Sequence, residues 1–274
     1  MDAICVVCKE RPCDFDEYLC LQCSRDLAIT SNERRLAYSQ LFNMAADYRK
    51  AIELGHSEKE VFHIAPAVSL HNARKLHYFI RLLDSVEGID GNYVECGVAQ
   101  GQSLLYLASI AFDSVSPRHI WGFDSFTGPG KIVQEDVMSN NNVFASEGTQ
   151  DAITNINALV SRLSGYGIPP IWLNSNVSIV AGFFEDTLKE YDRTPIAFLH
   201  LDCNYYKSYK TCLDFFYPLV QKGGIIAVDE YLGSYDLLHF PGAKKAIDEF
   251  CAETSEKVIL DKKYGKCYII KGDG

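Results

Sequence analysis

The order of hydrophobic and polar positions divides the chain into a short N-terminal stretch, a helical segment and a long alternating region. Apolar residues recur at helical spacing over 31–54 and again over 70–86, and Ser57–Glu60 has the form of a capping box for a short helix between them. From residue 92 onward, short apolar runs alternate with helical patterns. This alternation predicts a doubly wound α/β fold with a mostly parallel sheet of seven strands.

The predicted strands and helices of the alternating region follow one another closely. The seven strands are expected over 93–98, 119–123, 178–181, 196–201, 225–228, 258–260 and 267–271. The helices are expected over 103–112, 149–163, 206–220 and 241–253. The Gly223-Gly224 pair is expected to form the turn into the fifth strand. The polar stretch 127–148 is expected to be a lid or a disordered loop, because loops of this length are usually one or the other.

Four of the ten cysteines form two close pairs near the N-terminus. Cys5 and Cys8 make one C-x2-C pair, and Cys20 and Cys23 make a second, with 11 residues between the pairs. Two such turns can enclose a zinc ion in a tetrahedron of thiolates, and a site closed by four protein ligands is structural. We therefore predict a structural Zn²⁺ that folds a zinc-ribbon-like module of residues 1–28, with iron in the same ligand set or unliganded thiols as the alternatives.

The length and the net charge of the chain limit which domains and which partners we expect. At 274 residues the chain can hold one large domain over 88–274, a helical arm or lid over 29–87 and the small cysteine module. Asp and Glu outnumber Lys and Arg by 36 to 26, and the formal charge of -10 argues against nucleic acid or an anionic membrane surface as the partner. The N-terminus lacks a secretory pattern and no apolar run reaches about 18 residues, so we expect a cytoplasmic protein with reduced cysteines.

The ends of the first two predicted strands carry residues that suit a nucleoside ligand. Glu95 is followed by Gly97, Gly101 and a helix, so a ligand can approach the backbone closely. Neither G-x-G-x-x-G nor a P-loop is present, and an acidic residue beside a glycine turn suits a cationic ligand such as the amino acid end of S-adenosylmethionine. Asp124, at the end of the second strand, can accept both ribose hydroxyls of a nucleoside, and the alternative is that it caps a turn.

Three acidic residues follow the fourth and fifth predicted strands, namely Asp202, Asp229 and Glu230. If these strands are neighbours, their ends lie about 5 Å apart and the three carboxylates converge. Like charges this close need a cation or a proton, and hard oxygen ligands suit Mg²⁺, with Ca²⁺ or Mn²⁺ as substitutes. In the alternative, Glu230 points to solvent and Asp202 caps the following helix. His200 is expected to be a buried, hydrogen-bonded histidine.

Six segments in a fixed order make the chain similar to a known family. They are Tyr93–Gly97, Gly122–Phe126, Gly182–Leu188, the D-x-D-x-Y-x-S-like region from Asp202 to Ser208, Gly223–Tyr231 and Pro241–Phe250. Over about residues 70–253, the chain resembles the macrocin O-methyltransferase (TylF-like) family, which methylates sugar hydroxyls on natural products. Asn204 stands where the family has the second Asp of D-x-D, and Glu230 replaces the second Asp of D-D. The family does not ordinarily carry the four-cysteine module.

The resemblance implies a class I S-adenosylmethionine-dependent O-methyltransferase with a Rossmann-like sheet. The residues that it assigns to the cofactor are Glu95, Gly97, Gly101, Ser103, Asp124, Ser125, Phe126, Gly182 and Phe183. Mg²⁺ or another divalent cation at Asp202, Asp229 and Glu230 would bind the acceptor hydroxyl, and Asp202 could also take its proton as general base. The acceptor is expected to be a hydroxylated small molecule, a sugar by this resemblance. The helical arm and the zinc module favour a homodimer.

Two other function classes are the alternatives to this enzyme. A catalytically degenerate member of the same fold could act as an adaptor that recruits a partner through the zinc module, and the departures at Asn204 and Glu230 are compatible with this alternative. An NAD-dependent oxidoreductase on a similar sheet is disfavoured by the missing G-x-G-x-x-G motif and by the clustered acids at the strand ends.

Overall fold

The computed structural model describes residues 70–114, 118–140, 142–143, 152–165, 168–232 and 239–272. The chain divides into two compact units, Met1–Asp84 and Ser85–Gly274. Helix α4 (Leu70–Ser85), which lies almost entirely in the first unit, forms as the apolar pattern over 70–86 predicts. The helices predicted before residue 70 and the four paired cysteines lie outside the described residues. None of the described helices combines the length and the apolar character that a membrane span needs.

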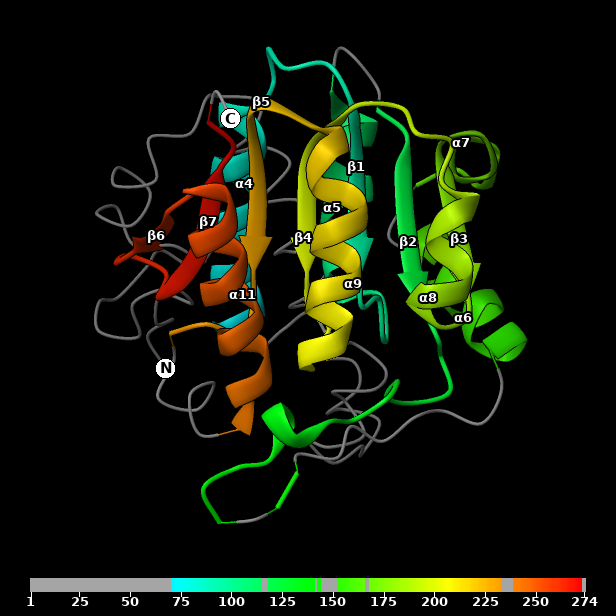
Figure 1. The fold of residues 1–274 in the computed structure, drawn as a ribbon. Coiled ribbons are helices and arrows are strands. Elements are labelled where there is room, and N and C mark those ends of the chain that lie inside the picture. Colours follow the sequence, from blue (N-terminus) through cyan, green and yellow to red (C-terminus); the bar gives the residue numbers. More distant parts are fainter. Residues whose placement is uncertain are drawn as a thin grey trace, which may run out of the picture. The chain divides into compact units, whose positions relative to one another are not determined.

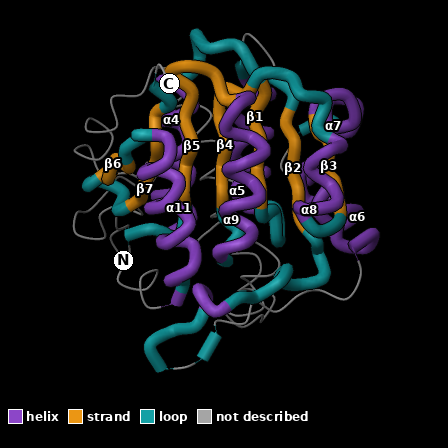
Figure 2. The backbone as a smooth tube through the Cα atoms, viewed as in Figure 1, coloured by secondary structure: helices purple, strands orange, loops and turns teal. Residues whose placement is uncertain are grey.

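The second unit is built on one seven-stranded sheet (Figures 1 and 2). Its strands are β1 (Asn92–Cys96), β2 (Ile120–Asp124), β3 (Val177–Ala181), β4 (Ile196–Leu201), β5 (Val220–Val228), β6 (Val258–Asp261) and β7 (Lys266–Ile270). They stand in the order β3-β2-β1-β4-β5-β7-β6. The pairs from β3 to β5 are parallel, and β7 is antiparallel to both of its neighbours. The structure therefore confirms the predicted, mostly parallel α/β sheet.

Helices cover both faces of this sheet. They are α5 (Gln102–Asp113), α6 (Ala152–Gly165), α7 (Pro170–Asn176), α8 (Phe184–Thr187), α9 (Tyr206–Phe216) and α11 (Pro241–Thr254), with 3-10 turns η2 (Gln134–Asp136), η3 (Leu188–Glu190) and η4 (Tyr217–Leu219). In Figure 1, α9 and α11 lie side by side on the near face, over β4 and β5, and α5 lies behind the sheet. Crossover helices on both faces bury both sides of the parallel strands, so every residue of β1 and β4 is buried.

The face under α9 and α11 holds a continuous hydrophobic core. Tyr209 and Phe216 of α9 and Ile247 of α11 are fully buried in one cluster with Phe123 and Leu201 of the sheet. Burial of each large apolar side chain contributes about 1.5–3 kcal/mol relative to its exposure. This packing holds the first turn of α9 close to the carboxyl ends of β4 and β5, where the acidic residues lie.

The structure corrects the prediction for Gly223 and Gly224, which lie inside strand β5 and do not form a turn into it. β5 begins at Val220, directly after η4, so the helix predicted over 206–220 ends earlier than its apolar pattern suggests. The register between β4 and β5 is irregular beside the two glycines, which is typical of a β-bulge. The sequence pattern also misses α7 and α8, because seven and four residues are too few to show helical periodicity.

Candidate functional site

Asp124 joins the loops that follow β1 and β2. Its Oδ2 accepts a hydrogen bond from the backbone N–H of Ala99 at 2.8 Å, and its Oδ1 accepts one from the backbone N–H of Phe126 at 2.6 Å. The side chain does cap a turn, as the alternative interpretation expected. It is only partly buried, and each carboxylate oxygen has a second acceptor position, so Asp124 can still receive two hydroxyl groups of a ribose.

The glycines after β1 make room for other parts of the protein. A Cβ atom on Gly97 would lie 1.9 Å from the carbonyl oxygen of Asp202, and one on Gly101 would lie 1.8 Å from Cδ1 of Leu159. Both glycines have positive φ, +92° and +79°. Gly97 therefore lets the loops after β1 and β4 touch, which brings the cofactor end of the sheet against Asp202. At both positions the space that a Cβ would fill is taken by the protein itself.

The remaining predicted cofactor residues differ in how accessible they are. Phe183, directly after Gly182 at the end of β3, exposes 43% of its surface, whereas the side chains of Phe126 and Ser103 are buried. Ser125 donates through its hydroxyl to the carbonyl of Gly128 at 2.5 Å and shapes the turn after β2. Of the two phenylalanines in the predicted cofactor set, Phe183 is the one whose ring is exposed.

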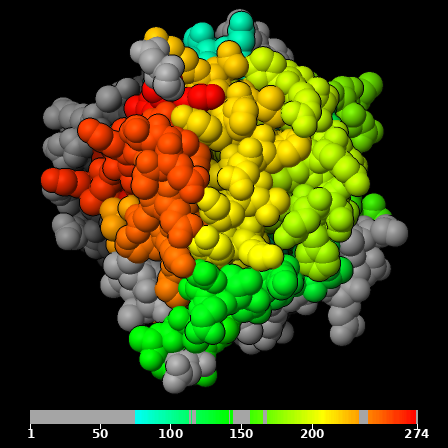
Figure 3. Space-filling view, viewed as in Figure 1, coloured from blue at the N-terminus to red at the C-terminus, as the bar shows by residue number. Residues whose placement is uncertain are grey.

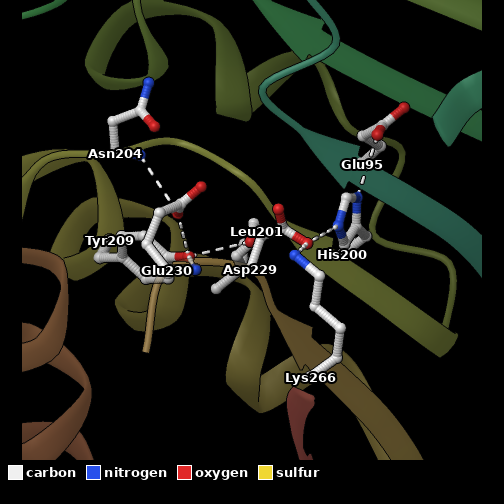
Figure 4. A network of polar contacts seen from close by, with 8 residues as sticks. All are labelled: Glu95, His200, Leu201, Asn204, Tyr209, Asp229, Glu230 and Lys266. Atoms are coloured by element: carbon white, nitrogen blue, oxygen red, sulfur yellow. Dashed lines mark hydrogen bonds and ion pairs between the residues drawn. The ribbon is translucent and has the colours of Figure 1, made fainter. Parts of the chain in front are cut away.

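Glu95 and His200 form a buried pair between β1 and β4 (Figure 4). The two residues are register partners in the parallel ladder, and each side chain is 1% exposed. Nδ1 of His200 lies 3.0 Å from Oε1 of Glu95. The expectation of a buried, hydrogen-bonded His200 is confirmed. Its partner is the same carboxylate that the sequence assigns to the cofactor.

The carboxyl ends of β4 and β5 bring Asp202 and Asp229 together, because the two strands are neighbours in the sheet. Nε2 of His200 lies 3.8 Å from Oδ1 of Asp229. One ligand atom from each of His200, Asp202 and Asp229 lies within 4.8 Å of the other two. Two carboxylates and an imidazole at this separation can hold a divalent cation.

Glu230 lies beside this group but turns into the protein. Its side chain is buried, and its Oε2 accepts a hydrogen bond from the hydroxyl of Tyr209 at 2.5 Å and one from the backbone N–H of Asn204 at 3.4 Å (Figure 4). Burial, and then the charges of Asp202 and Asp229, raise the pKa of Glu230 well above its usual value. The alternative in which Glu230 points to solvent is therefore wrong.

The first turn of α9 is capped by Asp136 and not by Asp202. The backbone N–H of Tyr206 donates to Oδ1 of Asp136 at 2.7 Å, and that of Val133 donates to Oδ2 at 2.9 Å. A Cβ on Gly242, at the start of α11, would lie 2.0 Å from the same Oδ1, so only glycine admits the carboxylate there. Figure 3 shows the loop after β2 lying against the ends of α9 and α11. Asp136 thus ties the described part of the predicted lid to the first turn of α9.

Lys266 is a further charged residue at this edge that the sequence analysis did not single out. Its Nζ lies 2.9 Å from Oδ1 of Asp229. The antiparallel register pairs Val228 with Cys267, so the next residues along each strand, Asp229 and Lys266, face one another. Only the pairing of β7 with β5 brings these residues together, and 36 residues separate them in sequence.

Comparisons with known proteins show the family and the fold of the chain. The profile of the family described as Macrocin-O-methyltransferase (TylF) matches residues 24–260, beginning directly after Cys23. The chain is 26% identical over 216 residues to mycinamicin III 3''-O-methyltransferase of Micromonospora griseorubida, covering 77% of this chain and 78% of that protein. It is 25% identical over 205 residues to demethyldecarbamoylnovobiocin O-methyltransferase of Streptomyces niveus, covering 72% and 74%. The crystal structure of CalS11, a calicheamicin methyltransferase, shares the fold with a TM-score of 0.66 at 22% identity, covering 84% of this chain and 93% of that one.

Proposed function

This chain belongs to the macrocin-O-methyltransferase (TylF) family and is an O-methyltransferase, and we propose that it methylates a hydroxyl of a sugar or of a sugar-bearing small molecule. S-adenosylmethionine, when bound, supplies an electrophilic methyl group. The two relatives are named as O-methyltransferases of mycinamicin III and demethyldecarbamoylnovobiocin, which supports a small-molecule acceptor. The family match leaves the alternative of an NAD-dependent oxidoreductase without support.

One structural observation carries the proposal: Asp124 and Asp202 stand at the carboxyl ends of strands on either side of β1. Two strand spacings amount to about 10 Å, a distance that a nucleoside and its attached amino acid chain can span. A donor whose ribose lies on Asp124 can therefore place its methyl group close to Asp202. In open α/β sheets ligands bind at this edge.

The cofactor residues act in three groups. Asp124 accepts the ribose hydroxyls, and Gly182 with Phe183 borders the adenine. We assign Glu95, which is buried and paired with His200, to the amino group of the donor, as the family resemblance implies. The rest of the proposed set shapes the two loops around these contacts and comprises Gly97, Gly101, Ser103, Ser125 and Phe126.

The acidic end of the site consists of His200, Asp202 and Asp229. It fits a divalent cation, because it combines hard carboxylate oxygens with one imidazole. We place Mg²⁺ or a similar cation at Asp202 and Asp229, with His200 or Glu230 as the third ligand. Such a cation, when bound, lowers the pKa of an acceptor hydroxyl. Burial and the charges of Asp202 and Asp229 raise the pKa of Glu230 and so favour a protonated side chain there, against the hydrogen bond from Tyr209, which makes His200 the better-placed of the two.

Asp202 is the proposed general base. Asn204, in the position of the family's second Asp, cannot take up a proton, and its backbone N–H is directed to Glu230. Asp202 is partly exposed at the strand end, whereas Glu230 is buried, so of these two acids Asp202 is the one that can reach a bound acceptor. We assign to the loop held by Asp136 the exclusion of water from a bound acceptor.

The N-terminal residues add a separate proposal. We propose that Cys5, Cys8, Cys20 and Cys23 bind one structural Zn²⁺ and that the arm following them supports a homodimer. The family profile begins at residue 24, so the cysteine module is an addition to the family and not part of its shared sequence. Metal analysis of the full chain, with light scattering for its mass, tests both statements.

Methyl transfer from radiolabelled S-adenosylmethionine tests the proposed reaction. The acceptors are glycosylated natural products with free sugar hydroxyls, each matched with its aglycone. We expect label on the glycosides, little on the aglycones, and loss of transfer in Asp202→Asn. Asp214→Asn, on the exposed side of α9, is the matched control and should transfer normally. Label on aglycones alone would contradict a sugar acceptor, and full activity of Asp202→Asn would contradict its role as base.

A further inference from the structure

Strand β7 places Lys266 at the acidic end of the site. The turn after β6 closes with the backbone N–H of Gly265 donating to the carbonyl of Asp261 at 2.8 Å, and Lys266 is the first residue of β7. Because β7 runs antiparallel to β5, its first residue stands at the carboxyl end of β5. The register therefore fixes Lys266 opposite Asp229.

The contact between Lys266 and Asp229 is sheltered compared with other ion pairs of the sheet domain. Lys266 is 16% exposed and Asp229 is 17% exposed. The pair of Lys245 with Glu135 is 50% and 29% exposed, and the pair of Lys210 with Glu253 is 23% and 63% exposed. A partly buried ion pair is screened less by water and salt than an exposed one.

The same oxygen of Asp229 is shared between two groups. Lys266 Nζ approaches Oδ1 at 2.9 Å, and His200 Nε2 approaches it at 3.8 Å (Figure 4). Asp229 is also one of the three residues whose ligand atoms can surround a cation. A divalent ion at this place would lie close to the ammonium group, and two cations at such a distance repel each other strongly.

We propose that Lys266 is the resident counter-ion of Asp229 and that it competes with a divalent cation for this carboxylate. The inference rests on the metal site of the proposed function. Lys266 neutralises part of the acid cluster in the metal-free protein, so the cluster is stable without an ion. A divalent cation must displace the ammonium group from Asp229 or bind beside it, and its affinity is lowered in either case.

The full chain is first treated with EDTA, and the chelator is then removed. Titration of this protein with Mn²⁺, measured through the electron paramagnetic resonance signal of the free ion, tests the competition. Zinc content is measured in parallel, so that sites at the N-terminal cysteines are counted separately. Lys266→Met should bind Mn²⁺ at least about tenfold more tightly than wild type, because the competing charge is gone. Lys266→Arg keeps the charge and should stay near wild type. Lys210→Met removes a lysine that pairs with Glu253 away from the site, and it should change nothing.

A second measurement keeps the test valid if Lys266→Met is less stable. We expect its melting temperature in EDTA to fall below that of wild type and to recover on addition of Mg²⁺, whereas wild type responds less to Mg²⁺. Equal Mn²⁺ affinity of wild type and Lys266→Met would overturn the proposed competition by Lys266 but would not contradict the metal site. Loss of the tighter binding in the double variant Lys266→Met/Asp229→Asn would support it. Failure of every variant to bind Mn²⁺ would overturn the metal site itself and, with it, the competition.

Discussion

The carboxylate of Asp124 accepts a hydrogen bond from the backbone N–H of Ala99 at 2.8 Å, so one side chain at the end of β2 fixes the loop that follows β1. Ala99 has a positive φ of 45°, a conformation that a residue with a Cβ rarely adopts without outside support. The contact ties the loop that follows β1 to the end of β2. Asp124 positions its neighbour and still has acceptor positions for a ribose.

Asp124→Asn should weaken binding of S-adenosylhomocysteine by about 10- to 100-fold, because the amide loses the charge and one acceptor oxygen, and charge-assisted hydrogen bonds contribute about 1.5–3 kcal/mol. Calorimetric titration measures the affinity. Asp192→Asn is the matched control, since Asp192 caps a turn in the same way through the backbone N–H of Thr194 at 2.9 Å. Equal loss of affinity in both variants would show that turn stability, and not ribose binding, is responsible.

Asp136→Ala should destabilise the protein by about 1–3 kcal/mol, because the backbone N–H groups of Tyr206 and Val133 lose their buried acceptor. Urea unfolding measures this change. We also expect KM for the acceptor to rise more than kcat falls, because the loop over the strand ends loses its attachment to α9. Glu135→Gln, which removes only the exposed pair with Lys245, is the control and should leave both quantities near wild type. A variant with normal stability and normal KM would contradict the anchoring role.

Glu230→Gln should alter the pH dependence of stability in the metal-free protein. The pKa of Glu230 in the folded state lies well above its usual value, through burial and the charges of Asp202 and Asp229. Its contribution to stability is therefore fully present below the usual pKa of a glutamate and is lost as pH rises through the raised value. Glutamine mimics the protonated acid, so the variant should gain stability relative to wild type over that window and show no gain below it. Urea midpoints measured from pH 4 to pH 9 in EDTA check this, and a constant difference across the range would show that Glu230 does not titrate there.

Cys20→Ser should release the proposed zinc ion without changing the affinity of the sheet domain for S-adenosylhomocysteine. A C-x2-C pair that loses one thiolate no longer closes a tetrahedral site. Metal analysis and calorimetry on the same sample give both results, with Cys251→Ser on α11 as the control outside the paired cysteines. One zinc ion per chain in the Cys20→Ser variant would contradict the proposed ligand set.

The sequence predicts the sheet and its functional edge because both depend on local patterns. Each parallel strand is a short apolar run, and Asp124, Asp202 and Asp229 stand directly after such runs. In a parallel sheet these ends share one edge, so the convergence of the acids follows once the strand alternation is recognised. The pairing of β4 with β5, which the sequence analysis stated as a condition, is what brings Asp202 to Asp229.

The rest of the site depends on contacts between distant segments and could not be predicted. Lys266 reaches Asp229 only through the antiparallel register of β7. Asp136 stands in a polar loop without periodicity, and its partner Tyr206 is 70 residues away. Gly97 is predicted to admit a ligand, and that stays a prediction; what the pattern does not indicate is that the carbonyl of Asp202 lies in the space beside it. A glycine shows that something approaches closely, and the sequence alone does not show whether that is a ligand or the protein itself.

Calorimetric titration of the full chain with S-adenosylhomocysteine, once with Mg²⁺ and once with EDTA, tests whether the sheet edge binds the methyl donor. We expect micromolar binding at one site per chain in both conditions, because the proposed ribose and amino acid contacts are those of Asp124 and Glu95 and not of the acid cluster. Absence of binding in both conditions, from protein that circular dichroism shows to be folded, would contradict the proposed donor and the site built around it.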